Sequence, residues 1–308
     1  MRLAFALAVS LALGCMSCDI GKVTVNTTSK VLLRAQPSLQ QEPDYELARQ
    51  AIPGALKTVE GFWIVDPENP RLIKILTEGY CQYGTAFVED DWEAAKFRKD
   101  IEAIDYHNTR SSNIFTRCLN YALTSLGARW RKEIFGTPEV VAKLIKDTGA
   151  GQRFPLLFAG MALGSIINHN LTRIEMIAHL TTVQQILERV IEIDTKNGPP
   201  ANKAHAALPY IALGMIHTAR GKSMGGDPEM GKKAFEQALT VTDQKFLLAR
   251  TLMAYRVGLA MNDRKFFHDE LKKVLETPPS VWPEQRLANE VAHRKARRYL
   301  SKEKELFQ

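Results

Sequence analysis

Apolar residues recur every three or four positions along most of the chain, which is the spacing of one face of an α-helix. The clearest example lies between Ala51 and Val88. There the first apolar face comprises Ala55, Val59 and Phe62, and the second comprises Ile73, Leu76, Thr77 and Tyr80. Two amphipathic helices are therefore predicted in this stretch.

A short connection, Asp66-Pro67-Glu68-Asn69-Pro70, separates these two helices. Pro67 cannot continue the first helix, and Pro70 suits the first turn of the second, so the chain is predicted to reverse here. The spacing of this helical hairpin is typical of tetratricopeptide repeats. Stacked hairpins of this kind usually form recognition surfaces rather than reaction centres.

The rest of the chain repeats this helical pattern irregularly. The predicted helices span residues 44–65, 70–89, 92–104, 110–133, 137–147, 154–168, 172–194, 201–220, 228–242, 244–260, 263–276 and 283–306. Thr137 and Asp227 each precede a proline and are predicted to cap the following helix. We predict an all-α fold of tetratricopeptide-like helical hairpins with irregular insertions, which close the chain into a compact or closed superhelix.

The N-terminal segment has the pattern of a secretory signal. Arg2 is followed by an apolar run from Leu3 to Leu13, which is too short to span a bilayer. No later stretch is expected to be long and apolar enough for a span. We therefore expect an exported protein.

Two cysteines, Cys15 and Cys18, end this leader, and either one could carry the acyl chains of a bacterial lipoprotein. Ordinary secretion is the alternative. Cleavage before Cys18 is favoured, because cleavage before Cys15 would leave an odd cysteine in an oxidising compartment. The predicted organisation is a signal peptide over 1–17, a lipid-anchored tether or short packed arm over 18–41, and a helical domain over 42–308.

The two remaining cysteines, Cys81 and Cys118, allow two interpretations. They could form one disulfide, or they could be small buried residues on helices. The buried free thiols are favoured, because a helical core of this size does not need a covalent link.

The formal net charge is +7, and part of the excess is local. The cluster HRKARR at 293–298 could contact nucleic acid or anionic lipid. Neighbouring glutamates favour a solvated helix face instead, and export argues against a nucleic-acid partner. The acidic run Glu89-Asp90-Asp91 lies where one helix is expected to end and another to begin, so capping or solvation explains it.

The sequence contains none of the common catalytic or metal-binding motifs. HExxH, GxSxG and a Gly-rich phosphate loop are absent, and the one CxxC spacing, at Cys15 and Cys18, lies in the leader. The seven histidines are dispersed. We therefore predict a protein that is not an enzyme and has no metal and no cofactor.

Aromatic and basic residues at helical spacing are the better candidates for a binding site. They are Tyr80, Tyr83 and Phe87 on one helix and Arg117 and Tyr121 on a later one, with Tyr210 and Tyr255 as further members. Such a stripe is usually core. If it lines a cavity, its apolar walls and Arg117 would suit an amphipathic ligand with a carboxylate.

Four segments together resemble one known family. They are CDIGKVTVN, AIPGALKTVEGFWIVDPENPRLIKILTEGYCQYGTAFVED, MGGDPEMGKKAFEQAL and KFLLARTLMAYRVGLAMNDRKFFHDELKKVL. In this order they are similar to the T component (TatT) of tripartite ATP-independent periplasmic (TRAP) transporters. The similarity extends over most of the mature chain.

This resemblance implies a periplasmic lipoprotein of tetratricopeptide-like hairpins, lipidated at Cys18, that forms trimers and associates with the solute-binding P component. The P component delivers an organic acid or hydrophobic ligand to a membrane permease. His217 stands where an aromatic residue is common in the family. The alternative function is a helical scaffold lipoprotein for envelope assembly.

Overall fold

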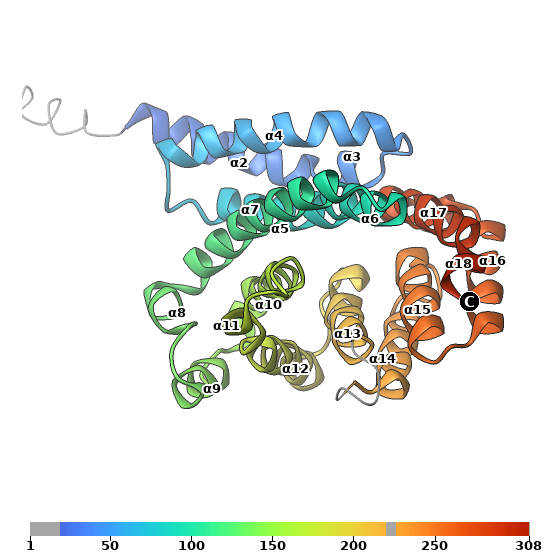
Figure 1. Cartoon of the computed structure of the whole chain (residues 1–308). Helices are drawn as coiled ribbons and strands as arrows, with labels where there is room; N and C mark the ends of the chain where they lie inside the picture. Colours follow the sequence, from blue (N-terminus) through green and yellow to red (C-terminus); the bar gives the residue numbers. More distant parts are fainter. Residues whose placement is uncertain (1–18, 220–225, 308) are drawn as a thin grey trace, which may run out of the picture.

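The computed structural model describes residues 19–219 and 226–307. Over these ranges the chain is all helical and has no strand, as predicted. Cys15 and Cys18 lie outside the described residues. Figure 1 shows helices that follow one another around a curved path, with α17, close to the C-terminus, returning beside α6.

The helices occur in simple chain order. They are α2 Ile20–Ala35, α3 Pro37–Gln40, α4 Tyr45–Val65, α5 Pro70–Tyr83, α6 Glu89–Arg98, α7 Ile101–Leu126, α8 Ala128–Glu133, α9 Pro138–Lys146, α10 Arg153–Asn168, α11 Ile174–Ile177, α12 Leu180–Asn197, α13 Lys203–His217, α14 Pro228–Val241, α15 Leu247–Ala260, α16 Arg264–Glu276, α17 Arg286–Ser301 and α18 Glu303–Leu306. Most of the long helices pack against their neighbours in sequence, and α17 also contacts α3 and α4 near the start of the chain. The superhelix is therefore closed.

Local caps explain where several of these helices begin. The side chain of Asn69 accepts hydrogen bonds from the backbone N–H groups of Arg71 and Leu72, directly after the turn that reverses the chain. Asp227 caps α14 by accepting from the N–H of Met230 at 3.0 Å. The predicted cap at Thr137 is wrong, because its side chain makes no capping hydrogen bond to α9.

Close contacts between a glycine and a bulky side chain set the separation of paired helices. A Cβ atom on Gly214 of α13 would lie 2.7 Å from the ring of Phe235 on α14. A Cβ on Gly160 of α10 would lie equally close, at 2.7 Å, to Ile186 on α12. The backbones can approach this closely only because these positions have no side chain.

The segment between α5 and α7 departs from the predicted boundaries. The expected helix over 70–89 changes to a π-helical turn, Gly84–Val88, and then continues as α6. Lys99 ends α6 in the left-handed conformation, with φ 58°. The next helix, α7, runs unbroken through residues 105–109, where the sequence predicted a break.

The segment expected to be a tether or short packed arm is helical in its described part. Asp19 accepts from the N–H of Lys22 and caps α2. Val25 and Ser29 are buried on its inner face, where the guanidinium of Arg71 donates to the Ser29 hydroxyl at 3.0 Å. Residues 20–35 are thus a packed helix rather than an extended tether, because one of their faces finds apolar and polar partners on the domain.

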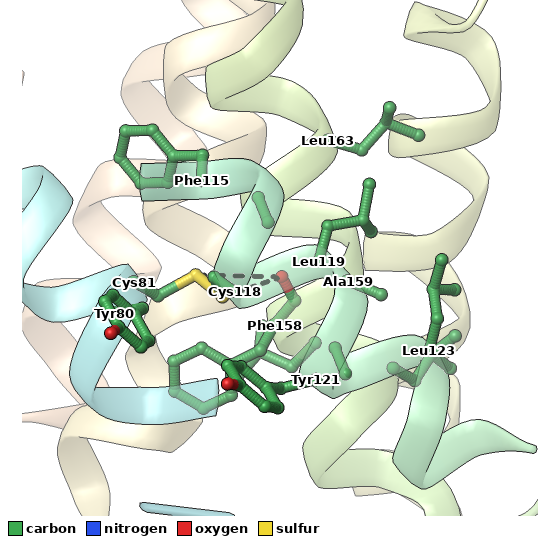
Figure 2. Close-up of a cluster of buried hydrophobic side chains, with 14 of the residues drawn as sticks. Tyr80, Cys81, Phe115, Cys118, Leu119, Tyr121, Leu123, Phe158, Ala159 and Leu163 are labelled. Carbon is green, nitrogen blue, oxygen red and sulfur yellow. Dashed lines mark hydrogen bonds between the residues drawn. A yellow bond between two sulfur atoms is a disulfide. The ribbon is translucent and has the colours of Figure 1, made fainter. Parts of the chain in front are cut away.

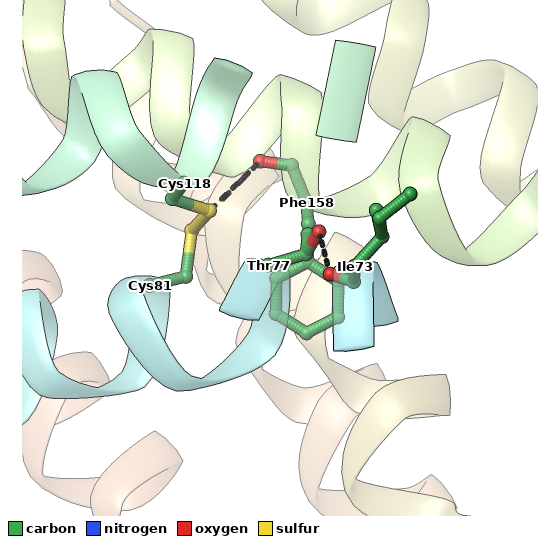
Figure 3. The surroundings of a disulfide bond; sticks show 5 residues. All are labelled: Ile73, Thr77, Cys81, Cys118 and Phe158. Carbon is green, nitrogen blue, oxygen red and sulfur yellow. Dashed lines mark hydrogen bonds between the residues drawn. A yellow bond between two sulfur atoms is a disulfide. The ribbon is translucent and has the colours of Figure 1, made fainter. Parts of the chain in front are cut away.

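Cys81 and Cys118 form a disulfide, so the favoured interpretation as free thiols is wrong. Both residues are buried, on α5 and α7, and their Cα atoms lie 5.4 Å apart. The carbonyl oxygen of Phe158 on α10 lies 4.0 Å from the Cys118 sulfur, and a dashed line marks this contact in Figure 3. Burial was predicted for these residues, but their position opposite each other on two packed helices depends on the fold.

In the described part of the chain, one helix is long and apolar enough to cross a membrane, contrary to the sequence-based expectation. It spans Ala150–Asn168 and includes α10. Most of it is buried inside the domain, where α10 packs against α5, α7 and α12. Its apolar character is accounted for by its place at the centre of the helical stack.

Loss of the disulfide should destabilise the domain. Closing the 37-residue separation between Cys81 and Cys118 reduces the entropy of the unfolded chain, which is worth about 3 to 4 kcal/mol. We expect the paired change Cys81→Ala and Cys118→Ala to lower the free energy of unfolding in urea by about this amount. Reductant should lower the wild-type midpoint in the same way and leave the double variant unchanged; an unaffected wild-type midpoint would contradict the bond.

Gly214→Ala tests the close approach of α13 and α14. The added methyl group meets the Phe235 ring, so we expect a loss of about 1 to 3 kcal/mol in thermal or urea unfolding. Gly61→Ala is the matched control, because a Cβ there meets no atom within 4 Å. That control should gain about 0.5 to 1 kcal/mol from helix propensity. Equal effects in the two variants would show that the contact does not limit packing.

Candidate partner- and ligand-binding site

The structure brings three of the predicted site residues together around a buried glutamate. The rings of Tyr80 on α5 and Tyr121 on α7 stack with centroids 6.0 Å apart, beside the disulfide (Figure 2). The Tyr121 hydroxyl donates to Glu60 on α4 at 3.0 Å, and Arg117 donates to the same oxygen at 2.7 Å. Lys57 also pairs with Glu60. This cluster links three helices.

The charge state of this cluster follows from these contacts. Burial by itself would raise the pKa of Glu60, but the hydrogen bonds from Lys57 and Tyr121 and the charge of Arg117 lower it. Glu60 is therefore ionised at neutral pH. Burial, together with the Glu60 charge, raises the pKa of both tyrosines, Tyr80 and Tyr121. Among the described residues, the buried Tyr80 hydroxyl has no hydrogen-bond partner.

Tyr83 and Phe87 belong to a neighbouring aromatic group. Their ring centroids are 5.5 Å apart, and Phe87 also lies 5.0 Å from Tyr45 of α4. Arg110 of α7 donates to the Tyr83 hydroxyl at 2.7 Å. Because Tyr83 and Phe87 are 6% and 1% exposed, this group is core packing in the structure as it stands.

Tyr210 and Tyr255 lie apart from both groups. Tyr210 is half-buried on α13, where burial and the nearby charge of Asp194 raise its pKa. Tyr255 on α15 stacks on Tyr299 of α17, with ring centroids 4.1 Å apart. The structure therefore does not gather all seven candidates into one site.

A second cluster of charged side chains joins α6 to α17 near the C-terminus. Asp90 of α6 is fully buried, and its carboxylate accepts from Arg294 at 2.9 Å and pairs with Lys295 and Arg298. Glu93, one turn further along α6, pairs with Lys295 at 3.0 Å. We call Asp90, Glu93, Arg294, Lys295 and Arg298 the closure cluster.

The closure cluster holds its carboxylates firmly in the ionised state. Burial would raise the pKa of Asp90 and Glu93, but the adjacent charges of Lys295 and Arg298 lower both, and that of Asp90 well below its usual range. The Tyr299 hydroxyl donates to Glu93 at 2.6 Å and satisfies its other oxygen. Each buried charge thus has opposite charges or hydrogen-bond donors close by, as a low-dielectric site requires.

The closure cluster corrects two interpretations of the sequence. The basic run at 293–298 is not simply a solvated helix face, since Lys295 is 5% exposed and pairs with α6. The acidic run is not simply a solvated cap either. Glu89 contacts His169 of α10 at 3.2 Å, and Asp91 binds Arg49 of α4 at 2.8 Å. The available signal was the acidic run at 89–91 together with the basic run at 293–298. The sequence does not show that these two runs, more than 200 residues apart, meet in the fold.

Two surface hollows lie away from the candidate tyrosines. One, of about 520 Å³, lies beside the closure cluster and is lined by Ala94, Phe97, Arg98, Lys99, Arg298, Lys302 and Glu305. The other, of about 280 Å³, lies among α14, α15 and α16. Neither hollow is lined by the candidate tyrosines, Phe87 or Arg117.

Comparison with known proteins identifies the family. A family model described as the TRAP transporter T-component matches residues 41–307. This chain belongs to that family. An uncharacterized protein of Treponema pallidum (strain Nichols) is similar, with 23% identity over 270 residues that cover 83% of this chain and 78% of the relative.

The T-component family has an accessory role in TRAP transport and is not known as a catalytic family. Over the described ranges, no group of three or more His, Cys, Asp or Glu side chains is placed to hold a metal ion. The carboxylates Glu60, Asp90 and Glu93 are all engaged by cations or tyrosine hydroxyls. Two further buried carboxylates, Glu78 and Glu270, contact His205 and Arg250. They hold helices together in this T-component chain.

Asp90→Asn should strongly weaken the closure of the superhelix. It leaves Arg294, Lys295 and Arg298 with one carboxylate among them, so we expect a loss of about 3 to 5 kcal/mol in urea unfolding at pH 7. Asp147→Asn is the matched control, because Asp147 pairs with Arg129 at the surface and should contribute little. Equal stability of Asp90→Asn and wild type would show that the cluster does not hold the ends together.

The stability difference between wild type and Asp90→Asn should depend on pH, and the lowered pKa of Asp90 determines the direction of this dependence. A carboxylate whose pKa is lowered in the folded state stabilises the protein at pH values above its pKa in the unfolded state, which is about 3.9. This stabilisation is lost as the pH falls toward the folded-state pKa. The stability difference between wild type and Asp90→Asn should thus be constant from pH 7 to about pH 5 and decrease below about pH 4. Urea midpoints measured across this range would show a constant difference if Asp90 were not the responsible group.

Proposed function

We propose that this T-component chain is a non-enzymatic periplasmic lipoprotein that binds the solute-binding P component of a TRAP-type transport system. The observation that carries the proposal is the family match over residues 41–307. A closed stack of helices also offers broad, rigid surfaces to a protein partner. We expect this partner to be a protein rather than a nucleic acid.

Two features support the periplasmic, lipid-anchored part of the proposal. The Cys81–Cys118 disulfide suits an oxidising compartment outside the cytoplasm. The leader ends in Cys18, the residue we propose to carry the acyl chains, with Cys15 as the alternative. Membrane attachment would then come from lipid, and α10 would remain in the core.

The proposal includes a holding site for a hydrophobic or organic-acid ligand near Tyr80. Its buried hydroxyl lies in the Glu60 cluster, and the Arg117 side chain is 49% exposed although it pairs with Glu60. Arg117 could exchange Glu60 for a ligand carboxylate, since guanidinium groups bind carboxylates in the same geometry. Tyr83, Phe87 and Tyr121 would supply the apolar walls of this site.

A trimer of this chain is part of the same proposal, on the strength of the family resemblance. The second candidate function is a scaffold lipoprotein for envelope assembly. The burial of Tyr80, Tyr83 and Phe87 in packed aromatic groups favours it, because a scaffold needs surfaces but no ligand cavity. The two functions predict different partners.

Recovery of the partner from the native envelope tests the proposed function. The full-length chain, with a C-terminal affinity tag, is expressed in its native host. The envelope is solubilised with a mild detergent, and the tagged protein is captured. We expect mass spectrometry to find a TRAP-type solute-binding protein enriched over a capture with an unrelated tagged lipoprotein from the same envelope. The match to the family and the helical surfaces are the reasons for this expectation.

Arg117→Ala serves to separate partner binding from ligand holding. If Arg117 holds a ligand carboxylate, this variant should still capture the solute-binding protein but lose binding of a probe fatty acid in fluorescence titration. Repeated capture of envelope-assembly proteins without any solute-binding protein would instead support the scaffold.

A further inference from the structure

Helix α2 has two faces with apolar residues on opposite sides, and one of them has no partner within residues 19–219 and 226–307. Its inner face contains Val25 and Ser29, which are buried against the domain. Its outer face contains Ile20, Val23 and Val31, which are 80%, 56% and 63% exposed. A helix that only packed on the domain would carry polar residues on that outer face.

The end of α4 extends this outer apolar face. Ile64 is 71% exposed and Val65 is 43% exposed. Val65 adjoins the first turn of α2, since a Cβ at Gly21 would lie 3.4 Å from its Cγ1. In Figure 1, α2 and α4 run together along one outer edge of the molecule. We call Ile20, Val23, Val31, Ile64 and Val65 the outer apolar face.

The charges on α2 suit an anionic surface. Between Ile20 and Ala35 the helix carries Lys22, Lys30 and Arg34 and no acidic residue. Asp19, just before the helix, is engaged as its cap, and Asp66 and Glu68 lie in the connection beyond α4. Apolar residues accompanied by lysine and arginine on one helix are the pattern of segments that lie in a membrane interface.

The position of the outer apolar face in the chain specifies its occupant. Cys18 precedes Ile20 by two residues, and two residues of extended chain span at most about 7 Å. If acyl chains on Cys18 are inserted in a bilayer, the first turn of α2 must therefore lie at the headgroups. A flexible tether would have allowed the domain to stand away from the membrane, but α2 is packed on the domain and begins immediately.

We propose that the outer apolar face of α2 and α4 lies on the lipid bilayer and fixes the orientation of the domain on the membrane. The proposal rests on the lipidation of Cys18 proposed above. The acyl chains hold the protein at the membrane, while Ile20, Val23 and Ile64 enter the headgroup region and the basic side chains of α2 contact anionic lipid. The opposite side of the domain is then presented to soluble partners.

Fluorescent probes on the full-length acylated protein test this contact. Val31→Cys and Ile64→Cys are each labelled with NBD, and the protein is reconstituted in vesicles of phosphatidylethanolamine and phosphatidylglycerol. Ile174→Cys is the matched control, because Ile174 is apolar and 82% exposed but lies on α11. We expect blue-shifted emission and about fivefold weaker quenching by iodide at positions 31 and 64 than at position 174. Nitroxide-labelled lipid should quench only the first two probes.

The outcomes separate this proposal from the lipidation that it rests on. Mass spectrometry of the N-terminus establishes acylation independently. Acylated protein whose probes at 31 and 64 are as accessible to iodide as the probe at 174 would overturn the membrane contact and leave the lipoprotein intact. Absence of acylation would overturn both. Probes protected equally in detergent and insensitive to nitroxide lipid would identify a contact between copies of the chain and overturn the proposal.

A charge variant provides a second measurement. Val23→Glu combined with Val31→Glu should leave the fold unchanged, because both side chains are largely exposed. In the acylated protein this variant should restore iodide quenching at position 64 toward the level at position 174. Unchanged protection at position 64 would show that the outer face of α2 does not hold the domain on the membrane.

Discussion

Three consecutive carboxylates at the start of α6 link this helix to three others, because each one contacts a different helix. Glu89 contacts His169 of α10, Asp90 binds the cations of α17, and Asp91 binds Arg49 of α4. Asp90 is the member on which closure depends, since it is fully buried and pairs with three cations of α17. Burying this carboxylate away from water is unfavourable unless cations lie beside it. The cations of α17 occupy that position in the fold. The helical stack is thereby closed rather than left as an open solenoid.

Helix α5 connects the candidate site to α6, the helix that carries the acidic residues of the closure cluster. The same helix carries Cys81, linked to α7, and Tyr80, stacked on Tyr121 of α7. The π-helical turn Gly84–Val88 then directs the chain into α6. A disulfide, an aromatic stack and an ionic cluster therefore follow one another along one continuous stretch. Any movement that opened a space beside Tyr80 would have to occur with α5 and α7 still covalently joined.

Most of the fold could be predicted because its signals are local. The reversal before Pro70 and the cap at Asp227 act through hydrogen bonds to residues two or three positions away. The candidate site was predicted less completely. Tyr80, Arg117 and Tyr121 do meet, because residues at helical spacing share a face, but the glutamate that joins them, Glu60, was missed. Its signal, a lone acid on the apolar side of an amphipathic helix, was present in the sequence.

By itself the sequence determined the all-α class, most helix positions and the family to which the segments are similar. These follow from periodicity, caps and the order of motifs, which all operate over short separations. Only the tertiary structure decided that Cys81 and Cys118 are bonded, that the basic run of α17 is partly buried, and that α2 leaves an apolar face uncovered. The physical reason is distance along the chain. Whether a charge is solvated or paired depends on what the fold brings within a few ångströms, and the partners of Asp90 lie more than 200 residues away.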